Sequence, residues 1–188
     1  MKATRLFFFL LPLFFSCSLS AQNKNTIRVG AGVNVRSSVD NDRLSAGPSL
    51  LVEYGRSVNS YFAVAVEIHT DMCKNSTASD LYGAGVSLRG MATPFPQKFR
   101  WVKVGVGTTY DRCKYLYGVH FKDKEGQSVL KHMQHSAGYW GIDFPIRAYF
   151  IDSRRFECYA FYNIKTMFTD GSYYWNYSHG GLAFGVRF

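Results

Sequence analysis

Apolar and polar residues alternate along most of this chain, and this alternation constrains the fold more than any other feature. On the segment 26–36, Ile27 and Val29 share one parity, whereas Arg28 and Asn34 share the other. Successive side chains of a β-strand point to opposite faces, so the pattern predicts strands with one apolar face. Eight such strands are predicted, over residues 26–36, 45–56, 61–71, 80–92, 99–112, 135–150, 156–168 and 176–188. We therefore expect an all-β domain.

The lengths of these segments and of their links favour one β architecture. Most segments reach the roughly nine to eleven residues that a tilted strand needs to cross a bilayer. Short links at 57–60, 93–98 and 151–155 alternate with longer polar links, of which the longest covers residues 113–134. Short periplasmic turns and longer extracellular loops are typical of outer-membrane barrels. We expect an eight-stranded antiparallel up-and-down transmembrane barrel with both termini on the periplasmic side.

The polar face of the predicted strands carries nearly balanced charge, although the whole chain has a formal net charge of +9. Charges confined inside a barrel must be paired, because burying one alone costs several kcal/mol. The predicted inward cations are Arg28, Arg36, Arg89, Lys103, Arg147, Lys165 and Arg187, and the inward anions are Glu53, Glu67, Asp71, Asp111, Asp143 and Glu157. We expect these residues to form a lumen charge network. The alternative is a soluble, secreted β-sandwich, in which the same residues would form a solvated mixed-charge surface.

The first residues have the features of a secretory signal peptide. Lys2 and Arg5 precede the apolar segment 6–15, and small residues follow it. This apolar core is shorter than the about 20 residues of a transmembrane helix. We expect Sec-dependent export with cleavage after Ala21, or alternatively after Ser20. The predicted domains are a signal peptide over residues 1–21 and a barrel over residues 22–188.

Two segments carry a resemblance to a known family. Residues 141–147, Gly-Ile-Asp-Phe-Pro-Ile-Arg, and the closing residues 181–188, Gly-Leu-Ala-Phe-Gly-Val-Arg-Phe, resemble small outer-membrane barrel proteins of the Bacteroidetes type. In architecture these are similar to the eight-stranded OmpA and OmpX barrels. The resemblance implies a Gram-negative outer-membrane location. It also implies that Phe188 is the signal by which periplasmic chaperones and the barrel assembly machinery recognise the chain.

A barrel of this size has little room for a pore. Eight strands enclose an interior that side chains can fill, whereas open channels need about sixteen. Tyr139, Tyr159 and Phe161 lie on the predicted inward face together with the large cations. We therefore expect a lumen filled by side chains, without bulk diffusion of nutrients.

The sequence offers little support for an enzyme or a metal site. His135 precedes Ser136 and Ser178 precedes His179, but neighbours on a strand point to opposite faces and cannot act together. His-x-x-x-His and Cys-x-x-Cys spacings are absent from the sequence. We expect a non-enzymatic protein without a cofactor. The alternative function is that of a lipid-modifying barrel enzyme, similar to lipid A deacylases.

Two cysteines suggest a structural role at the loop side. Cys73 and Cys113 follow the third and fifth predicted strands, and the exported compartment permits oxidation. A disulfide between them would connect two loops. Cys158 lies near the opposite end of the barrel.

We expect the function to be located in the longest predicted loop. Its cations are Arg112, Lys114, Lys122, Lys124 and Lys131, and aromatic residues lie among them. Such a surface suits phosphorylated lipopolysaccharide or another acidic ligand, whereas nucleic acid is excluded for an exported chain. The alternative is a basic loop that is simply solvated. We expect a structural or surface-binding protein whose partners are outer-membrane lipid and lipopolysaccharide.

Overall fold

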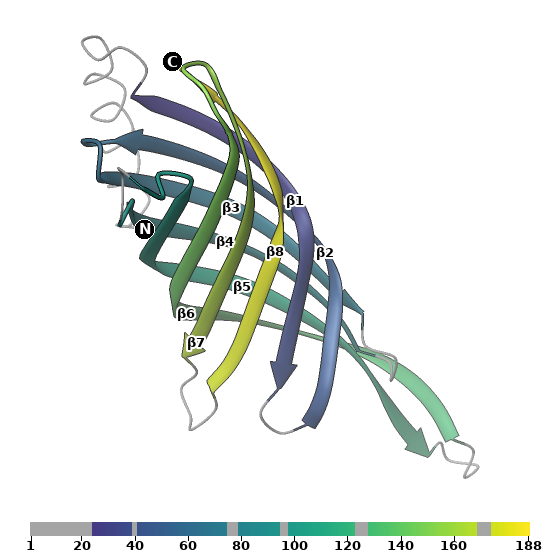
Figure 1. Ribbon diagram of the computed structural model, residues 1–188. Coiled ribbons are helices and arrows are strands. Elements are labelled where there is room, and N and C mark those ends of the chain that lie inside the picture. The colour runs from purple at the N-terminus through teal and green to yellow at the C-terminus, as the bar shows by residue number, and fades with distance from the viewer. Residues whose placement is uncertain (1–23, 39–40, 75–78, 95–97, 123–127, 169–173) are drawn as a thin grey trace, which may run out of the picture.

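The alternating segments pair with their sequence neighbours and close into an antiparallel barrel in this computed structural model (Figure 1). The structure describes residues 24–38, 41–74, 79–94, 98–122, 128–168 and 174–188. The strands are β1 (Asn25–Ser38), β2 (Asn41–Ser57), β3 (Phe62–Lys74), β4 (Ser79–Ala92), β5 (Val102–Lys122), β6 (Ser128–Asp152), β7 (Phe156–Phe168) and β8 (Tyr174–Arg187). The predicted fold class and the eight strands are confirmed. The predicted signal peptide lies outside the described residues.

Helices have no part in the described structure. Within these residues no helix is long and apolar enough to cross a membrane.

The barrel closes where β8 pairs with β1. Asn25 N–H donates to the Phe188 carbonyl at 3.1 Å, and Phe188 N–H donates to the Asn25 carbonyl at 3.0 Å. Farther along the pair, Gly32 faces Gly181. A Cβ on Gly32 would lie 2.1 Å from the Gly180 carbonyl oxygen, so only glycine permits this approach of the two backbones. The closing strand therefore depends on glycines as well as on its apolar face.

The two faces of the sheet have the polarity that the alternation predicts. Charged side chains such as Arg89 and Asp143 point inward and are buried. Large apolar side chains point outward, and Val29 is 58% exposed and Leu182 60% exposed. A barrel in water would have the reverse arrangement. The predicted assignment of the faces is confirmed, and it leaves a broad apolar belt around the outside.

The prediction of a loop over residues 113–134 is wrong. Strand pairing between β5 and β6 continues from Cys113 opposite Ala137 to Lys122 opposite Ser128. Residues 115, 117, 119 and 121 are Tyr, Tyr, Val and Phe, and this alternation of strand-forming residues extends the hairpin. The residues between them are Leu116, Gly118 and His120, so the apolar–polar alternation is incomplete here. In Figure 1 the β5–β6 hairpin projects beyond the other strands at the lower right.

The predicted short links at 57–60 and 151–155 are tight turns at the opposite end of the barrel. The side chain of Asn59 accepts the backbone N–H groups of Tyr61 and Phe62, each at 2.8 Å, between β2 and β3. Between β6 and β7, Ser153 Oγ accepts the N–H of Phe156 at 2.9 Å. These side chains replace backbone hydrogen bonds that the turns cannot form. We call this the turn end and the opposite one the loop end.

Candidate functional site

One carboxylate, that of Glu53 on β2, joins four strands across the middle of the lumen. Arg28 donates to Glu53 Oε1 at 2.7 Å, and Arg89 donates to Oε2 at 3.3 Å. Arg147 also donates to Oε2. All four side chains are buried. Three guanidinium groups therefore share Glu53 as a common counter-charge.

Further carboxylates complete this mid-barrel network. Arg89 donates from Nη2 to Glu67 Oε1 at 2.7 Å and from Nε to Asp143. Arg28 donates from Nε to Glu157 on β7. Each arginine of the network thus contacts at least one carboxylate, as confined charges require. We use the name mid-barrel network for Arg28, Glu53, Glu67, Arg89, Asp143, Arg147 and Glu157.

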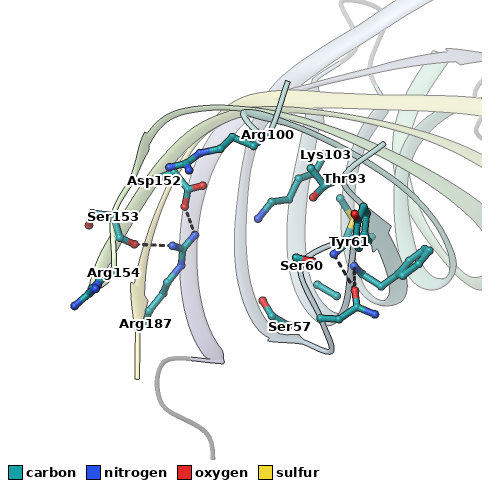
Figure 2. A pocket seen from close by; sticks show the side chains of 14 residues that line it. Ser57, Ser60, Tyr61, Thr93, Arg100, Lys103, Asp152, Ser153, Arg154 and Arg187 are labelled. Carbon is teal, nitrogen blue, oxygen red and sulfur yellow. Dashed lines mark hydrogen bonds and ion pairs between the residues drawn. The ribbon is translucent and has the colours of Figure 1, made fainter. Parts of the chain in front are cut away.

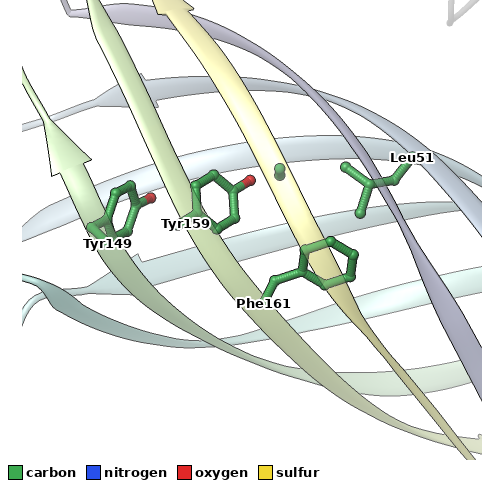
Figure 3. Close-up of a cluster of buried hydrophobic side chains, with 5 residues drawn as sticks. Leu51, Tyr149, Tyr159 and Phe161 are labelled. Atoms are coloured by element: carbon green, nitrogen blue, oxygen red, sulfur yellow. The ribbon is translucent and has the colours of Figure 1, made fainter.

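Aromatic side chains fill the lumen beside the network. Figure 3 shows Leu51, Tyr149, Tyr159 and Phe161 directed into the barrel from β2, β6 and β7. The Tyr149 and Tyr159 rings lie 4.8 Å apart between centroids, and the Arg147 guanidinium lies 5.2 Å from the centroid of the Tyr159 ring. These contacts occupy the space that an open channel would need.

Arg187 connects the network to the turn end. It donates to Glu157 Oε2 at 2.5 Å, to Asp152, and to the Ser153 carbonyl at 2.6 Å. The sequence did not single out Asp152, because it lies in the predicted short link 151–155, to which no face was assigned. A register shift in β6 between Tyr149 and Ile151 turns Asp152 toward Arg187. Bulges of this kind reverse strand parity, and the sequence pattern gave no sign of this one.

Lys103 does not join the predicted charge network. Its Nζ lies 4.3 Å from the centroid of the Tyr149 ring, and it has no ion pair with any described residue. It instead lines a cavity of about 1000 Å³ at the turn end (Figure 2). Its place near the start of β5 explains the difference, since the mid-barrel carboxylates lie deeper in the barrel.

A second polar group occupies the loop-end half of the lumen. Asp111 on β5 accepts the Thr109 hydroxyl at 2.8 Å, and His69 Nε2 lies 3.0 Å from the same carboxylate. Lys165 Nζ lies 2.8 Å from His69 Nε2 and 4.0 Å from Asp111 Oδ2. Asp71 is buried beside them, with Oδ2 3.9 Å from His69 Nε2. The two carboxylates and Lys165 each have fewer hydrogen bonds and ion pairs than Glu53 has in the mid-barrel network.

Two more buried polar residues lie in this loop-end half. Asn163 and His179 are directly opposed on β7 and β8. Neither their amide atoms nor their ring nitrogens have a hydrogen-bond partner among the described residues. Ser178 lies on the other face of β8 and is partly exposed, so it does not share a surface with His179. The side chain of His135 lies outside the described residues.

The predicted disulfide between Cys73 and Cys113 is absent, and both residues are free thiols. They lie within β3 and β5, with β4 between them. Neighbouring strands are about 4.8 Å apart, so strands two apart are about 9 Å apart, whereas a disulfide needs Cα atoms within about 7 Å. Cys73 donates to Asn34 Oδ1, and Arg36 donates to Cys113 Sγ at 3.8 Å. The two thiols, packed against Tyr139, instead form a small buried cluster.

The predicted basic surface lies along the projecting hairpin. Arg112 and Lys114 are exposed on β5, and Arg112 Nε lies 3.4 Å from the Ser136 hydroxyl. Lys122 and Lys131 lie in β5 and β6, although their side chains are outside the described part of the structure. Lys124 lies outside the described residues altogether. The register places the backbones of Arg112, Lys114, Lys122 and Lys131 on one hairpin rather than on a loop.

Metal-ligating residues do not cluster in the described part of the chain. No group of three or more His, Cys, Asp or Glu side chains there has an arrangement that could hold a metal ion.

Known proteins resemble this chain in structure but not in sequence. No family model matches the sequence, and no curated protein matches it significantly. The Ail attachment invasion protein of Yersinia pestis aligns over 89% of this chain and 100% of its own, with a TM-score of 0.54 and 14% identity. Neisserial surface protein A aligns over 87% and 97%, with a TM-score of 0.51 and 16% identity. At these identities the comparison identifies the fold, which is that of small outer-membrane barrel proteins.

Proposed function

We propose that this chain is a non-enzymatic outer-membrane barrel that binds an acidic ligand through the loop-end hairpin. The observation that carries the proposal is the inverted polarity of the barrel. Leu50 is 60% exposed and Ile68 58% exposed, whereas Glu53 and Glu67, on the same strands, are each 1% exposed. An apolar belt around a charged interior suits a hydrocarbon surrounding and not water.

The proposed location requires export and assembly. Residues 1–21 would direct Sec-dependent export, and Phe188 would present the closing strand to the assembly machinery. The Phe188 side chain is 52% exposed on the outer face. The turn end would face the periplasm and the hairpin would face outward.

Surface binding would depend on the cations of the hairpin. Arg112 and Lys114 are exposed on β5, and β5 and β6 extend beyond the neighbouring strands. Clustered cations attract phosphorylated or sulfated ligands by long-range electrostatics. A solved structure of Ail is a complex with the heparin analogue sucrose octasulfate, which gives a precedent for a polyanion on this fold. For the present chain we favour lipopolysaccharide, because the hairpin would stand among its headgroups.

Membrane fractionation tests the location. The chain should be recovered in the outer-membrane fraction and should migrate faster on detergent gels before boiling than after it, because folded barrels resist detergent until heated. Lipid A from a deletion strain should keep the acyl chains of the parent strain. A soluble protein without heat-modifiable mobility would refute the location, and an altered acyl pattern would favour a lipid A-modifying enzyme.

A pair of matched double variants tests the binding surface. Arg112→Gln with Lys114→Gln should weaken binding of the detergent-solubilised barrel to lipopolysaccharide several-fold at low salt, since each exposed charge contributes modestly. Lys98→Gln with Arg155→Gln removes two exposed cations at the turn end and should have little effect. Equal losses in both pairs would show non-specific attraction and contradict the proposal.

A further inference from the structure

The turn end of the barrel contains a cavity that the proposed surface function does not use. It encloses about 1000 Å³ and is lined from three sides. The β2–β3 turn contributes Ser57 and Ser60, the β4 and β5 ends contribute Thr93 and Lys103, and the β6–β7 turn contributes Asp152. Figure 2 shows these side chains arranged around an open mouth.

The cavity ends inside the barrel and does not continue through it. Lys103 lines the cavity, and its Nζ lies 4.3 Å from the centroid of the Tyr149 ring. Behind Tyr149 lie Tyr159 and Phe161, which are 1% and 5% exposed. The mid-barrel network lies beside these rings. Because the recess is closed at its inner end, it can hold a ligand but cannot let one pass through the barrel.

The lining of the cavity has an excess of positive charge. Its cations are Arg100, Lys103, Arg154 and Arg187, and its only carboxylate among the described residues is that of Asp152. Arg187 already contacts both Asp152 and Glu157. Among the described residues, Arg100, Lys103 and Arg154 have no carboxylate within ion-pair distance. The mid-barrel arginines contact carboxylates, whereas these three cations of the cavity lining do not.

Lys103 occupies the position from which a cation would contact a ligand. In Figure 2 its ammonium group extends into the mouth, between the Arg187–Asp152 pair and the side that bears Ser57 and Ser60. Thr93, which is 7% exposed, lies beside it. An ammonium group with hydroxyl donors near it matches the oxygens of a phosphate, which accept several hydrogen bonds at once.

We propose that this recess is an oxyanion site that binds a phosphate-bearing ligand from the turn-end compartment, with Lys103 as its central contact. The shared chemistry is a phosphate group, carried either by a soluble metabolite or by a phospholipid headgroup. Only the identity of the compartment rests on the proposed outer-membrane function. The site itself rests on the geometry of the turn end.

Phosphate binding by the refolded chain in a non-ionic detergent tests the proposal. Calorimetric titration with glycerol phosphate at constant ionic strength should show saturable one-to-one binding. Lys103→Met should weaken it about tenfold or more, because it removes a charge-assisted contact. Lys103→Arg keeps the charge and should stay within a few-fold of the parent. Lys98→Met removes an exposed lysine at the turn end that does not line the cavity and should leave binding unchanged.

The outcomes separate this site from the proposed surface function. Absence of saturable binding, or an equal loss in Lys103→Met and Lys98→Met, would overturn the site even if fractionation supports the membrane location. Heat-modifiable mobility confirms that each variant is folded. Displacement of glycerol phosphate by short-chain phosphatidylglycerol, but not by the matched phosphatidylcholine, would identify a headgroup as the source. Lack of displacement would identify a soluble phosphate, and both results support the site.

Discussion

The two halves of the lumen solve the same problem of buried polarity in different ways. In the mid-barrel network, Glu53 alone receives three guanidinium groups. In the loop-end half, Asn163 and His179 are as deeply buried, but their polar side-chain atoms have no partner among the described residues. Burial is therefore a poor guide to energetic importance in this barrel. What matters is how many groups lose a partner when one side chain is removed.

Removal of Glu53 should have the largest effect on stability. Glu53→Ala would leave Arg28 and Arg147 with a lost contact deep in the lumen, and breaking a buried ion pair in this way costs about 3–5 kcal/mol. We expect a large decrease in the urea concentration that unfolds the refolded barrel, measured by the loss of heat-modifiable mobility. The result would establish the mid-barrel network as the more tightly coupled half.

A carboxylate at the mouth provides the control for this variant. Asp152 also contacts Arg187, but its side chain is 25% exposed, and Arg187 keeps Glu157 and the Ser153 carbonyl as partners. Asp152→Ala should therefore cost less than about 1 kcal/mol. Equal destabilisation by the two substitutions would break the comparison between buried and partly exposed pairs.

Lys165 should give an intermediate effect, because it lies in the less densely paired half. Its Nζ contacts His69, lies 4.0 Å from Asp111, and lies 5.3 Å from the centroid of the Tyr177 ring. In Lys165→Met, Asp111 would keep the Thr109 hydroxyl and His69. We expect a loss of about 1–3 kcal/mol, measured by the same unfolding assay. A loss as large as that of Glu53→Ala would show that the two halves are equally coupled.

The alternation in the sequence was sufficient to predict the barrel and the side chains that face its interior. A strand period of two fixes the face of Arg28, Glu67 or Lys165 without any knowledge of their partners. The partners themselves depend on strand register and on residues far apart in sequence, as in the contact between Glu53 and Arg147. The sequence pattern therefore indicated a charged lumen but not that Glu53 is its centre.

Two local features explain what the sequence pattern missed. Strand β6 extends to Asp152, into the predicted link 151–155, and a register shift near Tyr149 turns this residue inward. At the turn end, the alternation predicted that Lys103 faces inward but could not show what lies near it, and Thr93 lies just beyond the end of β4. Both residues line the same cavity as Ser57, because closure of the sheet brings the strand ends at this side of the barrel together. The cavity is thus a product of closure and not of any local motif.

Asn163 should give the smallest effect of the three lumen positions and makes the comparison sharpest. It is 1% exposed on β7, two residues from Lys165, so burial alone would predict a costly substitution. Since no described protein group donates to its amide or accepts from it, Asn163→Val leaves no protein partner unsatisfied. We expect a change within about 1 kcal/mol, of either sign.

Asn163→Asp, which has nearly the same shape, separates the effect of polarity from that of packing at this position. It would introduce a carboxylate opposite His179, with no cation assigned to it by the described contacts. Burying an unpaired charge is costly, so Asp should destabilise the barrel more than Val in the same unfolding assay. If Val were instead the more damaging substitution, packing around Asn163 would outweigh hydrogen bonding there. The number of groups that lose a hydrogen-bond partner would then not explain the difference in stability between the loop-end half and the mid-barrel network.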